Sequence, residues 1–288
     1  MKKTIALFFL FTVNLIFAQA PIKVEESKPL AFGITEKLQS VQLSETRTIN
    51  IYLPEDYNPK DTITYPVIYI PDGGADEDFF HITGIVRYNT QPWIERFPKS
   101  IVVGIANTNR KRDFTFSVPN IDFVEKIGFK KTQFTAYGGS AKYIAFLEKE
   151  LQPYLKAKYK ANAHQTIIGE SMAGLLASEI LLKHRNLFDS YIIITPSLWW
   201  GDGSLLKEAP ALLKNAKGKT KVYLAACDKD EDKNMYDVAI TFRDIIQNSG
   251  SQTQVYYDYL PNELHSTAIH QAVYNAFRAF YPKTIYQK

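Results

Sequence analysis

Short, continuous apolar runs recur along most of the chain and alternate with longer stretches of mixed polarity. Runs of this length are typical of strands that are buried on both faces of a mostly parallel sheet. Two earlier segments, residues 36–43 and 47–53, instead alternate apolar and polar positions, which predicts two strands that pair with each other. The continuous runs occupy residues 67–70, 101–105, 166–169, 191–194, 222–225 and 255–260.

The stretches between these runs have helical periodicity. Ile144, Leu147, Leu151 and Leu155 recur three or four positions apart, which places them on one face of a helix. The alternation of strands and helices predicts an α/β fold, with a mostly parallel central sheet, an antiparallel N-terminal start and helices on both faces. Ligands in such sheets bind in the loops beyond the carboxyl ends of the strands. The helices are expected at about residues 78–96, 139–158, 172–184, 203–215, 235–249 and 267–280.

Residues 1–20 differ in character from the rest of the chain. Two lysines precede an apolar stretch, and small residues close the segment, in the order MKKTIALFFLFTVNLIFAQA. This is the pattern of a secretory signal peptide, and its apolar stretch is shorter than the ~20 residues that a membrane-spanning helix needs. We therefore expect a signal peptide that is cleaved near residues 18–20. A single domain in residues 21–288, exported to the periplasm or secreted and without a stable membrane anchor, would follow it.

The composition is that of an ordinary globular protein, with 45% hydrophobic and 22% charged residues. The formal net charge is +4, and no run of lysine or arginine marks a surface for nucleic acid, so a nucleic-acid partner is not expected. Cys227 is the one cysteine in the chain. A disulfide within the chain and a cysteine-rich metal site are therefore excluded.

A candidate nucleophile follows the apolar run at residues 166–169. The sequence Gly169-Glu170-Ser171-Met172-Ala173 comes between a predicted strand and a predicted helix, and it differs by one methyl group from the G-x-S-x-G nucleophile elbow. The alternative is that Ser171 simply caps an ordinary helix. Because a buried strand precedes the motif and a helix follows it, the sequence favours Ser171 as a catalytic serine.

A serine nucleophile needs a base within hydrogen-bonding reach. Of the five histidines, His265 lies in the loop after the last apolar run, at the end of the sheet where Ser171 is expected. It also follows the serine in the chain order serine, acid, histidine of α/β-hydrolases. The other four lie in predicted helices or at the opposite end of the sheet: His81, His164, His184 and His270.

The acid is expected after the run at residues 222–225. Four carboxylates follow it within five positions, so several candidates are open: Asp228, Asp230, Glu231 and Asp232. We expect Asp230, with Asp228 as the second choice, because about three residues beyond the strand suit the reach to a histidine. A solvated acidic loop is the alternative. The spacing also imitates a calcium loop, but Lys233 and Ala239 replace its essential glycine and glutamate, so no metal is expected.

Two backbone N–H groups are the expected donors to a developing oxyanion. One belongs to Met172, the residue after the nucleophile, and the other to the glycine-containing loop after residues 67–70. Gly73 is the expected donor in that loop, with Gly74 close behind, because glycine lets a backbone N–H approach a reacting oxygen. The alternative is an ordinary Asp-Gly turn.

The loop after residues 101–105 suggests a class of substrate. Residues 109–116 contain three cations and two phenylalanines, which suit an anionic ligand with planar rings. Arg112 is the candidate contact for the charge, and Trp199 and Trp200 are candidate walls of the pocket. In the alternative, Arg112 pairs with Asp113 or another acid, and the tryptophans belong to the core.

Several further motifs extend from residue 47 to residue 200: RTINIYLP at 47–54, YPVIY at 65–69, Asp72-Gly73, IVVGI at 101–105, Arg112-Asp113, Gly138-Gly139, Phe146-Leu147, FDSY at 188–191 and PSLWW at 196–200. With the elbow, they resemble the Putative esterase family of α/β-hydrolases over about residues 34–282. This family includes siderophore esterases, S-formylglutathione hydrolases, feruloyl and acetylxylan esterases and mycolyltransferases, and the periplasmic siderophore-esterase branch is the most similar.

The resemblance implies an α/β-hydrolase fold and a serine esterase that acts on a small-molecule ester without a cofactor. It also implies Ser171 as the nucleophile, His265 as the base, and backbone donors at Met172 and Gly73. The chain departs from the family at Ala173, where glycine is usual, and in the residues before His265. Some siderophore esterases work with a serine–histidine pair and no firm acid, which leaves Asp230 open.

Two other functions remain open on the same scaffold. An acyltransferase would use a sugar or lipid acceptor in place of water. A catalytically silent member would only bind a ligand, although the presence of both Ser171 and His265 argues against this.

Overall fold

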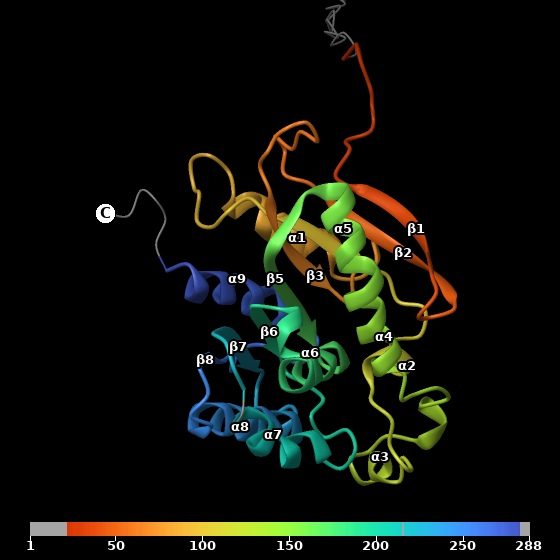
Figure 1. Cartoon of the computed structure of the whole chain (residues 1–288), viewed down its shortest axis with the longest axis vertical. Coiled ribbons are helices and arrows are strands. Elements are labelled where there is room, and N and C mark those ends of the chain that lie inside the picture. The colour runs from red at the N-terminus through yellow and green to blue at the C-terminus, as the bar shows by residue number, and fades with distance from the viewer. Residues whose placement is uncertain (1–21, 215, 283–288) are drawn as a thin grey trace, which may run out of the picture. The chain divides into compact units, whose positions relative to one another are not determined.

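The computed structural model of the chain describes residues 22–214 and 216–282 (Figure 1). The expected signal peptide at residues 1–20 lies outside these residues. Residues 22–32 contain no helix or strand, and the described residues from Gly33 onward form one compact unit. Among the described residues, no helix is both long enough and apolar enough to cross a membrane.

The described part of the chain forms one eight-stranded sheet in the order β1-β2-β4-β3-β5-β6-β7-β8. The strands β1 and β2 pair antiparallel, as the alternating pattern predicted, and β2 is also antiparallel to β4. All other neighbours are parallel. The strands are β1 (Ile34–Ser40), β2 (Glu45–Tyr52), β3 (Tyr65–Ile70), β4 (Ile101–Ile105), β5 (Ala161–Glu170), β6 (Ser190–Ile194), β7 (Thr220–Ala226) and β8 (Thr253–Tyr259).

Helices cover both faces of the sheet. Because β-α-β connections are right-handed, the connection from β3 to β4 and those from β5 onward run in opposite directions and place their helices on opposite faces. The helix α9 contacts α1, whereas α6 contacts α7 and α7 contacts α8. The helices are α1 (Phe79–Asn89), α2 (Arg110–Phe114), α3 (Phe123–Lys126), α4 (Ser140–Phe146), α5 (Gln152–Tyr159), α6 (Met172–Lys183), α7 (Ser204–Lys214), α8 (Lys233–Asn248) and α9 (Ala268–Phe280).

This strand order confirms the predicted α/β-hydrolase fold. The predicted helix at residues 139–158 is continuous but contains a π turn at Leu147–Leu151 between α4 and α5. The helix predicted at 78–96 ends earlier, at Asn89. Pro92 follows two residues after its cap, and proline cannot continue a helix because it lacks an N–H and clashes with the preceding turn.

The strand order reverses its direction between β3 and β5. This reversal makes the carboxyl ends of these two strands the point where open α/β sheets bind ligands. The loop after β3 begins at Pro71, and the loop after β5 is the turn at Ser171. The topology therefore places the candidate nucleophile at this ligand-binding edge.

A buried ion network fixes α2 to the sheet. The Arg47 side chain in β2 is 0% exposed and pairs with Asp113, whose side chain is 1% exposed. Glu45 Oε1 lies 2.6 Å from Arg47 Nη2, and Arg112 binds Glu45 and Asp113 from the solvent side. These contacts hold α2, which follows β4, in one position against β2.

Removal of one partner from this network should destabilise the fold strongly. Asp113→Ala removes the fully buried partner of Arg47 and leaves the guanidinium with the partly exposed Glu45 alone. Breaking a buried pair costs about 3–5 kcal/mol. The free energy of unfolding from denaturant titration should fall by that amount. Asp237→Ala, which breaks an exposed pair with Lys233 on α8, is the control and should change it little. Equal losses in the two variants would show that the network does not stabilise the fold.

Candidate active site

Ser171 occupies a strained turn between β5 and α6. Its φ is 58° and its ψ is −117°, in a region that non-glycine residues rarely adopt. A Cβ atom on Gly169 would lie 2.3 Å from the carbonyl oxygen of Ala173, so only glycine fits two residues before the serine. Ala173 itself is fully buried, and its methyl group is accommodated where the family usually has glycine. The local geometry is that of a nucleophile elbow.

The end of β6 holds this turn in place. The Ser171 N–H donates to the carbonyl of Ile194 at 3.0 Å, and the Ser197 N–H donates to the carbonyl of Ser171 at 2.9 Å. The two serine hydroxyls also lie within hydrogen-bonding distance, with 3.3 Å between their Oγ atoms. The backbone of the candidate nucleophile is therefore fastened on both sides to the neighbouring strand and the loop that continues it.

The loop that contains His265 is fastened to the acidic loop after β7. The Leu260 N–H donates to Ala226 at 2.8 Å, and the Asp228 N–H donates to the carbonyl of Glu263 at 2.9 Å. The His265 N–H donates to a carboxylate oxygen of Glu231. These bonds keep the histidine and the acidic residues together at the carboxyl edge of the sheet.

The charges around His265 act on its pKa in opposite directions. Burial of the ring lowers the pKa below its ordinary value, the negative charges of Asp232 and Glu231 raise it, and the Arg110 guanidinium lowers it. Within the described residues, His265 Nδ1 is buried without a hydrogen-bond partner, and Ser171 Oγ contacts Ser197 rather than His265. A serine–histidine contact often tightens only when substrate is bound.

The structure places Asp230 on the surface, with its N–H donating to Asp228 Oδ1 at 3.0 Å. No contact joins its carboxylate to His265 in the described part of the chain. The carboxylates that influence the histidine are those of Asp232 and Glu231, which were among the alternatives left open by the sequence. Asp232 also caps α8, because its carboxylate accepts a hydrogen bond from the Met235 N–H at 3.0 Å.

The two expected oxyanion donors differ in availability. Met172 is the first residue of α6, and the N–H groups of a first turn have no acceptor within their own helix. The Gly73 N–H instead donates to the carbonyl of Ile105 at 3.0 Å. The Gly74 N–H donates to Glu77 Oε2 at 2.6 Å. Both glycine donors are thus hydrogen-bonded within the protein.

Gly73 has a clear packing role. A Cβ atom at this position would lie 2.2 Å from Gly104 Cα, so the chain after β3 can approach β4 only if residue 73 is glycine. The bond from Gly73 to Ile105 continues the pairing of these two strands beyond β3. The glycine that the sequence suggested as a donor is therefore required for strand packing.

Arg110 was missed by the sequence analysis, which chose Arg112 in the same loop. Arg110 binds both carboxylate oxygens of Asp72, at 2.7 and 2.8 Å, and its Nη2 donates to the carbonyl of Glu170 at 3.1 Å. Glu170 immediately precedes the candidate nucleophile. A helix turns about 100° per residue, so residues 110 and 112 of α2 point in different directions. Once α2 is known to be a helix, this difference in direction shows that Arg110 and Arg112 cannot contact the same group.

Carboxylates crowd the same region. Burial, together with the nearby charges of Asp78 and Asp72, raises the pKa of Glu170 to about 8 against the opposing effect of Arg110. Burial also raises the pKa of Asp78 to about 7, with contributions from Asp72 and Glu77. The low dielectric beside Ser171 therefore favours neutral carboxyl groups, with Arg110 as the compensating cation.

The proposed substrate contacts have other partners in the structure. Arg112 binds Glu45 and Asp113, which is the structural alternative that the sequence left open. Trp200 is 0% exposed and donates from Nε1 to the carbonyl of Phe116 at 2.9 Å. Trp199 is 8% exposed and donates from Nε1 to the sulfur of Met235. The tryptophans belong to the core, and their rings do not form an open pocket wall.

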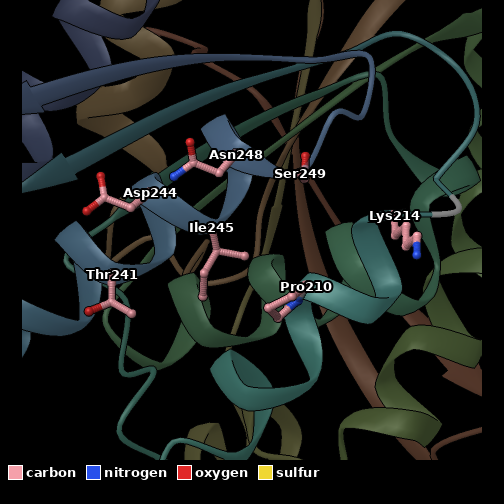
Figure 2. Close-up of a pocket in the computed structure, with 7 residues that line it drawn as sticks. All are labelled: Pro210, Lys214, Thr241, Asp244, Ile245, Asn248 and Ser249. Atoms are coloured by element: carbon pink, nitrogen blue, oxygen red, sulfur yellow. The ribbon is translucent and has the colours of Figure 1, made fainter.

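Other grooves lie away from the elbow. One of them lies between α7 and α8 (Figure 2), has a volume of about 610 Å³, and is lined by none of the candidate catalytic residues. The lining consists of Pro210, Lys214, Thr241, Asp244, Ile245, Asn248 and Ser249. Across the described ranges, no group of three histidine, cysteine, aspartate or glutamate side chains is arranged to hold a metal ion.

Several proteins with similar sequences or structures are named as esterases or serine hydrolases. The ferri-bacillibactin esterase BesA of Bacillus subtilis is 27% identical over 209 residues, which are 68% of this chain and 71% of the relative. An IroE-like serine hydrolase from Shewanella oneidensis has a TM-score of 0.79 at 27% identity, covering 87% of this chain and 80% of that one. The BES protein from Bacillus cereus has a TM-score of 0.76 at 25% identity, covering 91% and 100%.

The family comparison covers most of the chain. Residues 40–282 match the family described as Putative esterase. The match includes the elbow, the acidic loop and the loop of His265. The chain therefore belongs to this esterase family, as a carboxylic ester hydrolase of the serine hydrolase type.

Proposed function

We propose that the protein hydrolyses its ester through an acyl-enzyme formed on Ser171, with His265 as the general base. The observation that supports this most directly is the strained position of Ser171 between β5 and the first turn of α6. An ordinary helix cap needs no left-handed φ, whereas an elbow needs it to project the hydroxyl above the sheet.

The chemistry follows from this geometry. Ser171 Oγ attacks the ester carbonyl while its proton passes to His265 Nε2, and a tetrahedral oxyanion forms. The Met172 N–H at the positive end of α6 donates to that oxyanion. Arg110 holds the carbonyl of Glu170, the residue before the nucleophile. Collapse of the intermediate expels the alcohol, which takes the proton from His265. A water molecule activated by His265 then releases the acid.

We assign the acidic partner of the histidine to Asp232, assisted by Glu231, in place of Asp230. Their negative charges favour the imidazolium that forms when His265 accepts the serine proton. Asp230 is exposed, and among the described residues its carboxylate neither contacts His265 nor contributes to the shift of its pKa. The hydrogen bond from His265 N–H to Glu231 supports an orienting role for this loop.

The substrate that we propose is a siderophore ester. The support comes from relatives, since BesA is a ferri-bacillibactin esterase and two fungal relatives are a siderophore triacetylfusarinine C esterase and a siderophore enterobactin esterase.

We also propose that the protein is exported, on the basis of the signal-peptide pattern in residues 1–20. An acyltransferase would be distinguished by a transfer product when alcohol or sugar acceptors are supplied.

A panel of esters should test both activity and substrate class. We expect kcat/KM to be highest for a catecholate trilactone, followed by feruloyl, acetyl-xylan and short p-nitrophenyl esters. Ser171→Ala should lose on the order of 10⁶ in kcat, the effect of removing a nucleophile from such a site. More than trace activity in this variant at unchanged melting temperature would refute the nucleophile, whereas a preference for the short neutral ester would refute only the substrate class.

The pH dependence should identify the acid. His265 must be neutral to accept a proton, so kcat/KM rises as pH rises through its pKa, which burial lowers below its ordinary value. Asp232→Asn removes a charge that raises this pKa and should move the acid limb of the profile to lower pH. Asparagine also preserves the cap of α8.

Asp230→Asn is the matched control for this prediction and should leave the limb in place. If the acid limb of the kcat/KM profile moved in Asp230→Asn and stayed in place in Asp232→Asn, Asp230 would be the acidic partner of His265.

A further inference from the structure

Ser197 contacts the candidate nucleophile through both its backbone and its side chain. Its N–H donates to the carbonyl of Ser171 at 2.9 Å, and its Oγ lies 3.3 Å from Ser171 Oγ. The Ser197 residue is 1% exposed. Within the described residues its hydroxyl has no other hydrogen-bond partner, so the contact with Ser171 is what satisfies this buried polar group.

The loop that contains Ser197 is shaped for this contact. Thr195 has a φ of 38°, so the chain turns sharply where β6 ends. A Cβ atom on Gly174 would lie 3.1 Å from Pro196 Cα, so a larger residue there would push the loop away by a few tenths of an ångström. The glycine at position 174 of α6 thus lets the loop approach the elbow. The strained turn at Thr195 and the absence of a side chain at Gly174 together bring the Ser197 hydroxyl close to the Ser171 hydroxyl.

We propose that Ser197 is a positioning residue for the nucleophile, whose hydroxyl donates a hydrogen bond to Ser171 Oγ during the reaction. This inference rests on the proposed role of Ser171. When the Ser171 proton points toward His265, Ser171 Oγ is left as an acceptor, and Ser197 Oγ is the donor at the right distance. The bond then fixes the direction from which the nucleophile attacks.

Only the proton of Ser171 moves between the serine and the histidine, and the proton of Ser197 stays in place. In the attack, the Ser171 O–H bond breaks, its proton passes to His265 Nε2, and the Oγ–carbon bond forms. Ser197 keeps its own proton throughout, so its hydrogen bond strengthens while negative charge is present on Ser171 Oγ. In deacylation the same oxygen leaves and takes its proton back from His265. Ser197 therefore stabilises both steps without changing its own bonds.

Kinetics of two alanine variants should reveal this role. Ser197→Ala should lower kcat/KM and the rate of fluorophosphonate labelling by the same factor, about tenfold to a hundredfold, as expected for a lost hydrogen bond to a charged group, with KM unchanged. Ser178→Ala is the matched control. Ser178 is another buried serine, but its hydroxyl donates to the carbonyl of Gly174 rather than to Ser171. It should retain both rates.

A titration that does not need turnover separates this inference from the proposed function. In Ser171→Cys, the hydroxyl of Ser197 would donate to the thiolate and lower the pKa of the new thiol. Ultraviolet absorbance of the thiolate should show that pKa rising by about 1 when Ser197→Ala is added. The native thiol does not interfere, because burial raises the pKa of Cys227 to about 12. The Ser178→Ala change in the same background should leave the titration unaltered.

The outcomes are distinct. An unchanged thiol titration, together with labelling rates within twofold of each other in the two alanine variants, would overturn the positioning role. A shifted titration in a protein that hydrolyses no ester would retain the hydrogen bond and refute the proposed function instead. If Ser197→Ala does not fold, Ser197→Cys has a weaker donor and should give a smaller loss of the labelling rate in the same direction. This variant is tested with Ser171 in place, because two neighbouring thiols could form a disulfide.

Discussion

The close approach at the elbow is the constraint on which the rest of the site depends. A left-handed φ at Ser171 costs about 1–3 kcal/mol and persists only when the surroundings oppose its relaxation. Every residue of α6 from Met172 to Leu182 is buried, and a single buried leucine contributes about 1.5–3 kcal/mol. The helix therefore cannot move away to relieve the turn. Its burial on the sheet outweighs the strain and keeps the serine hydroxyl above the carboxyl edge.

The position of this edge in the fold explains why the remaining groups gather there. The loops after β3, β5, β7 and β8 end on the same side of the sheet because those strands are parallel. Arg110 joins the loop after β3 to the carbonyl before Ser171, and backbone hydrogen bonds join the loop of His265 to the acidic loop. A cation, a partly buried imidazole and several carboxyl groups thus share a region of low dielectric, where charges interact more strongly than in water.

The sequence predicted the features that depend on neighbouring residues. Apolar runs located the strands, and the short spacing of Gly169 and Ser171 located the elbow, because both patterns reflect local geometry. Features that depend on distant segments were not predictable in this way. Arg112 and Arg110 look equivalent until Glu45 and Asp72 are placed beside them. The choice among four acidic residues likewise required the loop of His265, which is fastened to Glu231 from more than thirty positions away.

The sequence also left open whether Gly73 and the Trp199–Trp200 pair contact the substrate or only pack within the fold. Gly73 is needed because Gly104 packs against it, and the N–H that the motif suggested is used to extend the pairing of β3 with β4. Trp199 and Trp200 follow a strand at the catalytic edge, but the segment between α2 and α4 folds over them. In both cases long-range packing decides the role, and one sequence does not contain that packing in a local pattern.

The central claim is that Ser171 is the reactive serine. The direct measurement is mass spectrometry of tryptic peptides after reaction with a fluorophosphonate. Ser171 and Ser197 fall in separate peptides, residues 161–183 and 186–207. Our account predicts one adduct per chain, located by fragmentation at Ser171. An adduct on Ser197, or no adduct in a protein that still hydrolyses esters, would contradict it.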